Sequence, residues 1–217
     1  MKAVVKAVLM HAEARTRSDT SGKVREPVLK LSAFMRAFPH SSDTGHFKVG
    51  NTDNPGTALA QSPLRSPSVF NYFRPGYVAP GTGASSRSLQ SPEMQIAHET
   101  TAAGYVNYMR DNISSGVGQF NGTVGTVVRN RRDLQADYSA ELALANDAAA
   151  LTDRVLGKLT YGNTSAALRT EVINAVGSIT IPALTSTNQA AVDTAKRSRV
   201  NAALLLVVAS PEFQVQQ

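Results

Sequence analysis

The sequence predicts an all-α protein, an irregular helical domain with long ordered loops. Apolar residues recur every three or four positions in segments along most of the chain, which is the spacing of one helix face. The tripeptide Ser-Pro-Glu, which joins an N-cap, a first-turn proline and an acid near the positive helix end, occurs at 91–93 and 210–212. Alternation typical of strands is weak and confined to 123–129, where one short β-hairpin is the alternative to a loop.

Length and composition are those of one large globular domain or two small ones. The chain has 217 residues, of which 42% are hydrophobic and 18% are charged, values that permit a sizeable core. We expect a single helical domain over 1–217, with a loop-rich region at 40–90 and a C-terminal helical subregion at 136–217. The absence of cysteine excludes disulfides, thiol catalysis and cysteine-based zinc sites. The longest apolar run, 202–209, is too short to cross a bilayer, so no transmembrane segment is predicted.

Helical spacing and helix-ending residues set the helices expected in the first half of the chain. Pro27 stands in the first turn, where a helix tolerates proline, and Pro39 ends the same element. Residues 40–57 lack periodicity and are expected to form a long surface loop. The expected helical segments are 3–15, 27–38, a short turn at 58–61, and 91 to about 113.

Capping residues set the helices expected in the second half. Residues 114–132 are rich in Gly, Ser, Asn and Val and are expected to form a loop. Asp137 is expected to cap a short helix at 138–145, and Asn146 or Asp147 to cap the next. The later elements are a helix that Gly162 ends, one from Thr164 to Gly177, one from 188 to 209, and a short turn at Ser210.

The basic charge is unevenly distributed. The formal net charge is +6, and residues 1–135 carry a balance of +7 whereas residues 136–217 carry −1. Apart from a cluster at 129–132, the arginines and lysines are scattered. Scattered basic charge promotes solubility and weak attraction to polyanions, so no specific nucleic-acid partner is predicted.

No metal, cofactor or catalytic residue is predicted. His40, Asp43 and His46 share one loop and could meet at a metal, but polar loop residues are more often solvated, and we favour that interpretation. Asp137 and Glu141 share a helix face, where an N-cap and a first-turn acid suffice to explain them. Phosphate-binding loops and nucleophile motifs are absent.

The segment from Arg65 to Tyr77 is the most unusual part of the chain. It holds four aromatic residues, two arginines and two prolines, although only 6% of all residues are aromatic. As a platform for a ligand or partner, it offers aromatic faces for stacking and arginines for binding carboxylate or phosphate. The candidate binding residues are Arg65, Asn71, Tyr72, Arg74 and Tyr77.

A structural interpretation of the same segment competes with the binding interpretation, and the two can coexist. As a clamp, Phe70 and Phe73 anchor an irregular loop to the helices. Arg65 and Arg74 then bind backbone carbonyls or the C-terminal ends of helices. We favour the clamp.

These motifs resemble the bacterial family catalogued as domain of unknown function 1800. The matching stretches follow the order of the family and cover nearly the whole chain. They are 5–15, 22–29, 63–77, 91–96 and 209–213. The resemblance implies a mostly helical fold and a match to the C-terminal part of longer proteins. It also implies export, which favours a periplasmic or extracellular location, and it supplies no activity or cofactor.

The residues and the resemblance together predict a non-catalytic helical module of a bacterial envelope or extracellular protein. Such a module acts through protein contacts, with a protein partner or by self-association. The alternative is part of a hydrolase acting on a polymeric or anionic substrate, with Arg65, Asn71, Arg74 and Tyr77 in substrate binding. Its catalytic groups would lie largely in an N-terminal half that this sequence lacks.

Overall fold

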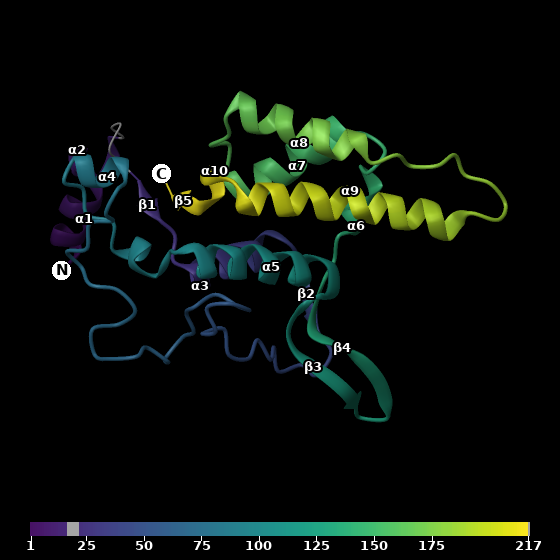
Figure 1. Ribbon diagram of the computed structural model, residues 1–217, viewed down its shortest axis with the longest axis horizontal. Coiled ribbons are helices and arrows are strands. Elements are labelled where there is room, and N and C mark those ends of the chain that lie inside the picture. Colours follow the sequence, from purple (N-terminus) through teal and green to yellow (C-terminus); the bar gives the residue numbers. More distant parts are fainter. Residues whose placement is uncertain (17–21, 217) are drawn as a thin grey trace.

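The computed structural model describes residues 1–16 and 22–216. Its centre is a layered helical body (Figure 1). The long helix α9 (Gln189–Ala209) lies between a pair formed by α7 (Ala148–Thr160) and α8 (Ala166–Ser178) and a layer that contains α3 (Pro27–Ala37) and α5 (Glu99–Ser115). Because α9 contacts α5, α7 and α8, this helix joins the two layers.

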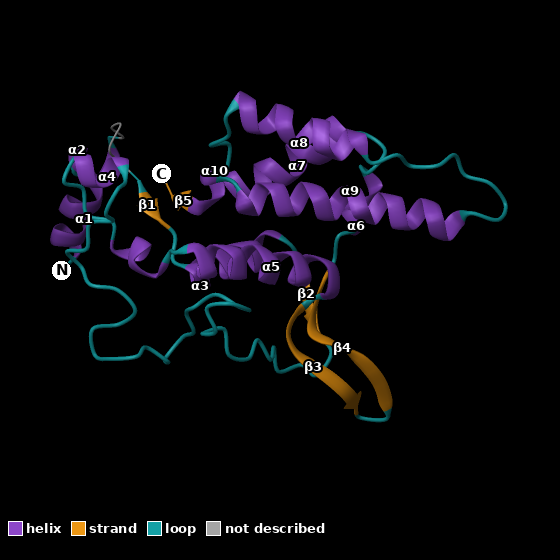
Figure 2. Cartoon of the chain, viewed as in Figure 1, coloured by secondary structure: helices purple, strands orange, loops and turns teal. Residues whose placement is uncertain are grey.

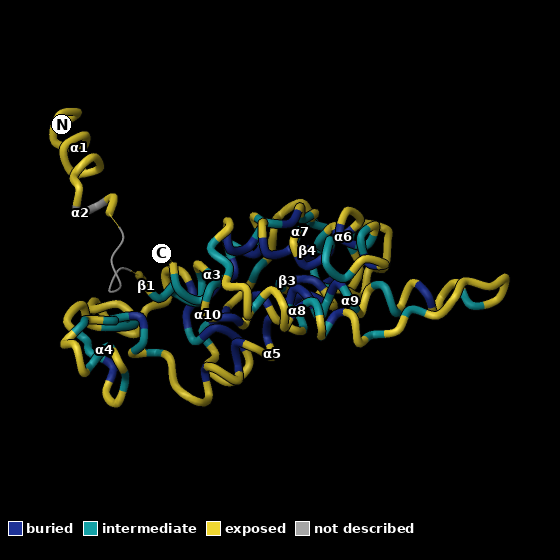
Figure 3. Tube along the Cα trace, turned by 90° about the horizontal axis from the view of Figure 1, so that it is seen from above, coloured by how far each residue is buried: buried dark blue, intermediate teal, exposed yellow. Residues whose placement is uncertain are grey.

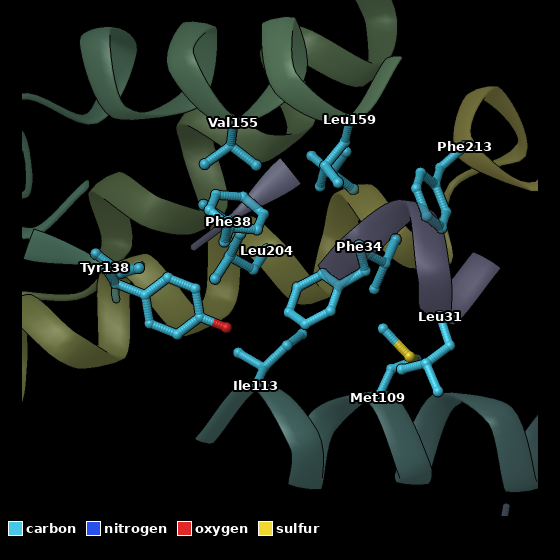
Figure 4. Close-up of a cluster of buried hydrophobic side chains, with 14 of the residues drawn as sticks. Leu31, Phe34, Phe38, Met109, Ile113, Tyr138, Val155, Leu159, Leu204 and Phe213 are labelled. Atoms are coloured by element: carbon cyan, nitrogen blue, oxygen red, sulfur yellow. The ribbon is translucent and has the colours of Figure 1, made fainter. Parts of the chain in front are cut away.

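The hydrophobic core fills the space between these layers (Figure 4). The rings of Phe34 and Phe38 lie 5.5 Å apart, and the ring of Tyr138 meets that of Phe38 edge-on at 5.5 Å. Burying one large apolar side chain stabilises a fold by roughly 1.5–3 kcal/mol. The core side chains include Leu31, Phe34, Phe38, Met109, Ile113, Val155, Leu159, Leu204 and Phe213.

Two antiparallel sheets correct the all-α prediction, because the fold mixes helices and strands (Figure 2). The strands β3 (Val117–Val124) and β4 (Val127–Ala136) form a long hairpin that extends away from the helical body. The strand β2 (His40–Ser42) pairs with β4, and β1 (Lys23–Val24) pairs with β5 (Val215–Gln216). The prediction of a loop at 114–132 is therefore wrong. The hairpin also extends well beyond the short hairpin at 123–129 that was the alternative.

The hairpin lacks the pattern that would have predicted it. Most residues in its outer half are exposed on both faces, whereas an apolar alternation needs one buried face. Two register shifts between β3 and β4 interrupt the period further. Only at the base does the hairpin enter the core, through Val117 and Leu134.

Several expected helices are confirmed, most clearly where a cap begins them. The carboxylate of Asp147 accepts hydrogen bonds from the backbone N–H groups of Ala149 and Ala150, each at 3.0 Å, and α7 follows. Ser210 caps α10 (Pro211–Gln214) in the same way. The helices expected at 27–38 and 188–209 correspond to α3 and α9. The short helix expected at 138–145 is α6 (Ser139–Ala143).

Other expected helices are shorter or divided. The single helix expected from 91 to about 113 is divided in two. A short 3-10 helix, η1 (Pro92–Ile96), comes first, and after a break α5 begins behind His98. The helix expected at 3–15 divides at His11 into α1 (Lys2–Met10) and α2 (Ala12–Arg15). Residues 58–61 form no helix, and a short helix that was not expected, α4 (Gly83–Ser86), follows the long loop.

The N-terminal helix α1 stands apart from the rest of the molecule (Figure 3). None of its residues is buried. Among the described residues, no helix combines the length and the apolar composition needed to cross a membrane.

Candidate functional site

The segment from Arg65 to Tyr77 is an irregular chain that runs outside the helical body (Figure 1). Tyr72 attaches its middle, because the hydroxyl donates to the carbonyl of Ser62 at 2.9 Å and accepts from the Ser62 N–H at 3.0 Å. Phe70 leaves 73% of its surface exposed, so it does not anchor the segment. Val69 and the preceding Leu64 are also fully exposed apolar residues.

Arg65 is paired with a carboxylate rather than with backbone carbonyls. Its Nε donates to Asp53 Oδ2 at 2.8 Å. This hydrogen bond lowers the pKa of the Asp53 carboxyl and raises the pKa of Arg65. Both side chains are solvated, so the pair positions the loop more than it stabilises the fold.

The remaining candidate binding residues lie along the surface. Arg74 does not act as a clamp through its side chain, because its guanidinium makes no hydrogen bond or ion pair with any residue that the structure describes. Its hydrogen bonds are made by the backbone: its N–H donates to Gln95 Oε1 and its carbonyl accepts from the Tyr77 N–H. Asn71 is exposed and has a left-handed φ of 66°. Tyr77 is half-buried, and its carbonyl accepts from the Ser91 N–H at 2.8 Å. The five residues thus follow one strip of chain, and one of them, Arg65, lines a hollow of about 330 Å³ beside α3.

The carbonyl-binding role that the sequence suggested for Arg65 and Arg74 belongs to other cations. Arg199 Nε donates to the carbonyl of Ile179 at 2.8 Å, and its Nη1 donates to that of Ala145 at 3.0 Å. Lys158 Nζ donates to the carbonyl of Ala37 at 2.7 Å. Nothing in the local sequence distinguishes these residues, because the carbonyls they bind lie 20 to 121 positions away.

Asp133 is a buried carboxylate that the sequence analysis missed. It accepts hydrogen bonds from Ser42 Oγ and Asn121 Nδ2, each at 2.8 Å, and from the backbone N–H groups of Thr44 and Lys48, each at 2.9 Å. Burial alone would raise the pKa of Asp133, but these donors outweigh it and hold the pKa well below its ordinary value. A carboxylate bound by four donors anchors the 42–48 loop and is poorly suited to take up a proton.

The loop with His40, Asp43 and His46 does not assemble a metal site. Both carboxylate oxygens of Asp43 accept from Arg131 at 2.7 Å. The Nδ1 of His40 lies 2.7 Å from the carbonyl of Phe38. Among the described residues, no three His, Asp or Glu side chains converge as metal ligands would.

A cavity of about 200 Å³, lined by no residue of the Arg65–Tyr77 segment, lies between the start of α3, η1, α5 and the C-terminal end of the chain. Arg25, Lys30, Glu93 and Tyr105 are its polar residues of note. Sequence analysis did not find this site, because its two cations come from an ordinary helix start and its opposite wall lies more than sixty residues later.

Comparison with known proteins gives one match. A family model described as "Protein of unknown function (DUF1800)" matches residues 1–215. No curated protein and no solved structure matches the chain. The match confirms the resemblance found in the sequence motifs and brings no activity, ligand or site residue with it.

Proposed function

We propose, from the premise that the chain belongs to the DUF1800 family of proteins of unknown function, that it is a non-catalytic module acting through protein contacts. The contact that the geometry supports best is self-association. In this contact, α1 of one copy packs into an apolar groove beside α3 of a second copy. The observation that carries the proposal is the exposure of the apolar face of α1.

The apolar face of α1 has no partner within the described chain. Val4, Val8 and Leu9 leave 61%, 62% and 65% of their surface exposed. The spacing of Val4, Val5 and Val8 makes one stripe, while Lys2 and Lys6 lie together on another side of the helix. Removing this apolar face from water is favourable only when another apolar surface packs against it.

Two α1 helices are too short to form a stable pair by themselves. Nine residues give a helix only about 13.5 Å long. Stable interfaces bury about 1,200–2,000 Å² in total, which a pair of helices of two and a half turns does not supply. A short amphipathic helix instead binds stably when a groove surrounds its apolar face.

A groove of suitable chemistry runs along α3. Two adjoining hollows, of about 330 and 620 Å³, share Ser32 and Met35. Their apolar lining includes Val28, Leu31, Met35, Phe38, Val49 and Phe47. Successive residues of α3 at helical spacing thus face the groove, as in known helix-in-groove contacts.

Electrostatic attraction does not drive this contact. Arg36 and Lys158 border the groove, and α1 carries Lys2 and Lys6, so like charges approach one another. Apolar contact must therefore supply the affinity, and salt should screen the repulsion. We expect association to persist or strengthen between low and high salt.

Light scattering after size-exclusion chromatography tests the proposal over a series of protein concentrations. We expect the wild type to approach twice the 23.0 kDa of one chain. The double variant Val5→Asp, Leu9→Asp on α1 and the variant Ser32→Arg in the groove should each remain at the mass of one chain. The matched control Lys2→Gln, Lys6→Gln changes the same helix on its polar side and should still associate.

Any of three results would contradict self-association through α1 and the groove. A wild type that stays monomeric at every concentration excludes it. Association that survives both the α1 and the groove variants assigns it to another surface. Binding of the monomer to lipid vesicles, lost in Val5→Asp, Leu9→Asp, would assign α1 to a membrane surface instead.

The envelope or extracellular location and the hydrolase alternative stay predictions. The location rests on the family resemblance, and the hydrolase alternative rests on the binding residues of the Arg65–Tyr77 segment together with a missing N-terminal half. No contact among the described residues favours the hydrolase over the contact module.

A further inference from the structure

Arg25 and Lys30 both line the 200 Å³ cavity, and among the described residues neither forms an ion pair, although Glu93 lines the cavity as well. Arg25 follows β1, and Lys30 lies in the first turn of α3. The opposite wall is formed by the first turns of α5, and Val24 of β1, Ala209 at the end of α9 and Gln214 of α10 close one end. Figure 1 shows these parts of the chain near one another. The site therefore lies where the first and last parts of the described chain come together.

The guanidinium of Arg25 is only partly satisfied. Its carbon lies 5.0 Å from the centre of the Phe213 ring. Its Nη1 is buried and makes no hydrogen bond with any described residue. A buried guanidinium nitrogen without an acceptor is costly, and native structures seldom contain one without a reason.

Lys30 has an aromatic contact in place of an ion pair. Its Nζ lies 5.0 Å from the centre of the Tyr105 ring. Burial, and then the charge of Arg25, lower the pKa of Lys30 to about 8. The lysine therefore loses its proton at a lower pH than an ordinary lysine, because the cost of burying its charge exceeds the stabilisation from the Tyr105 ring.

The other charged groups around Lys30 already have partners. Glu93 is paired with Lys23 at 3.2 Å, and Glu26 accepts from Gln61 Nε2 at 2.6 Å. Tyr105 donates its hydroxyl proton to the carbonyl of Val208. Neither carboxylate forms an ion pair with Lys30 or Arg25 among the described residues, so the excess positive charge in the cavity remains.

We propose that this cavity binds a small monocarboxylate, with the carboxylate between Arg25 and Lys30 and an apolar body in the cavity. Arginine and lysine are the donors that bind carboxylates in proteins, and the rest of the lining is mainly apolar. A cavity of about 150 Å³ holds a benzene molecule, so this one accepts a ligand of about benzoate size. The apolar residues that receive the body are Val24, Pro27, Leu59, Ile96, Ala102 and Val106.

Calorimetric titration of the full chain with sodium benzoate tests the proposal, with benzamide as the neutral probe of the same shape. We expect benzoate to bind and benzamide to bind at least about tenfold more weakly, since hydrogen bonds to charged groups contribute that much. Lys30→Met should weaken benzoate binding by a similar factor. The control Lys48→Met, which removes an exposed lysine elsewhere, should leave it unchanged.

A second pair of measurements separates binding from folding. Because the charge of Lys30 is desolvated and unpaired, Lys30→Met should unfold at the same urea concentration as the wild type or at a higher one. Ala102→Leu narrows the cavity from an exposed position of α5 without changing any charge, and it should also weaken benzoate binding.

Proton linkage gives an independent signature. A bound carboxylate favours protonated Lys30, so binding near pH 8.5 should take up protons, measured as a dependence of the heat on the buffer used. Benzoate and benzamide binding equally, or Lys30→Met binding benzoate as the wild type does, would overturn the proposal. Inorganic phosphate binding more tightly than benzoate would overturn the carboxylate assignment. Loss of binding in Lys30→Met without loss of self-association would separate this site from the α1 contact.

Discussion

At the scale of single residues, three backbone carbonyls from two chain segments depend on Arg199. Its guanidinium binds the carbonyls of Ile179, Ala145 and Asn146, which lie after α8 and between α6 and α7. A cation near a helix end stabilises carbonyls that no intrahelical N–H reaches. Arg199 therefore connects α9 to the ends of its neighbours.

Replacing Arg199 should destabilise the fold, whereas replacing Arg74 should not. Arg199→Met leaves carbonyls without their donor and should lower the free energy of unfolding by about 1.5–3 kcal/mol. Arg74→Met is the matched control, because that exposed side chain makes no hydrogen bond or ion pair with a described residue, and it should change stability by less than about 0.5 kcal/mol. Urea denaturation followed by circular dichroism measures both.

The same pair of variants decides between the interpretations of the Arg65–Tyr77 segment. An equal loss of stability in the two variants would show that Arg74 is part of a clamp that the structure does not reveal. An unchanged stability with a lost ligand or substrate would favour the binding interpretation. Sequence analysis identified the segment because its composition is local, but the partners Asp53, Ser62 and Gln95 are set by the path of the chain.

At the scale of elements, β3 contains a glycine at a point where any side chain would collide with the neighbouring loop. Gly118 has a φ of 94°, and an added Cβ would lie 2.3 Å from the carbonyl oxygen of Lys48. That carbonyl also accepts the N–H of Gln119 at 2.8 Å, so the 42–48 loop and β3 are held together at this point. Asp133, across the hairpin in β4, anchors the same loop.

Gly118→Ala should therefore lower the free energy of unfolding by about 2 kcal/mol or more, through backbone strain and the contact with Lys48. Gly122→Ala in the same strand is the control. Apart from its chain neighbours, no atom of the described residues lies within 4 Å of its added Cβ, and its φ is not positive, so stability should change by less than about 1 kcal/mol. Equal midpoints for the two variants in urea denaturation would show that the loop moves freely away from β3.

The elements that sequence analysis predicted are those whose signals are local. Asp147 and Ser210 bind N–H groups two or three residues away, so their helices could be located from the sequence. The hairpin was missed because its exposed strands carry only a weak alternation, at 123–129, and because its pairing with β2 and its contacts with the 42–48 loop join residues far apart in the sequence. The break before α5 was missed because Thr101 binds the carbonyl of Ile96 and the N–H of His98, which ends η1 and starts a new helix.

At the scale of the whole molecule, buried ionisable groups set the dependence of stability on pH. Lys30 has a pKa of about 8 in the folded chain and 10.5 as an ordinary lysine. Between these values the unfolded chain holds a proton that the folded chain has lost, so the free energy of unfolding rises with pH. Burial acts in the opposite sense on Tyr105 and Tyr138, whose pKa values it raises above the ordinary value of 10.0.

The unfolded tyrosines lose their protons above pH 10 while the folded ones retain them, so stability should fall there. The stability of the unliganded chain should consequently rise from about pH 8 and pass through a maximum near pH 10. Urea midpoints measured at intervals from pH 7 to pH 11 locate this maximum. Lys30→Met should remove the rise, and Tyr138→Phe should reduce the later fall. A wild-type midpoint that declines steadily from pH 8 would show that Lys30 keeps its proton in the folded chain, and that its charge already has a partner.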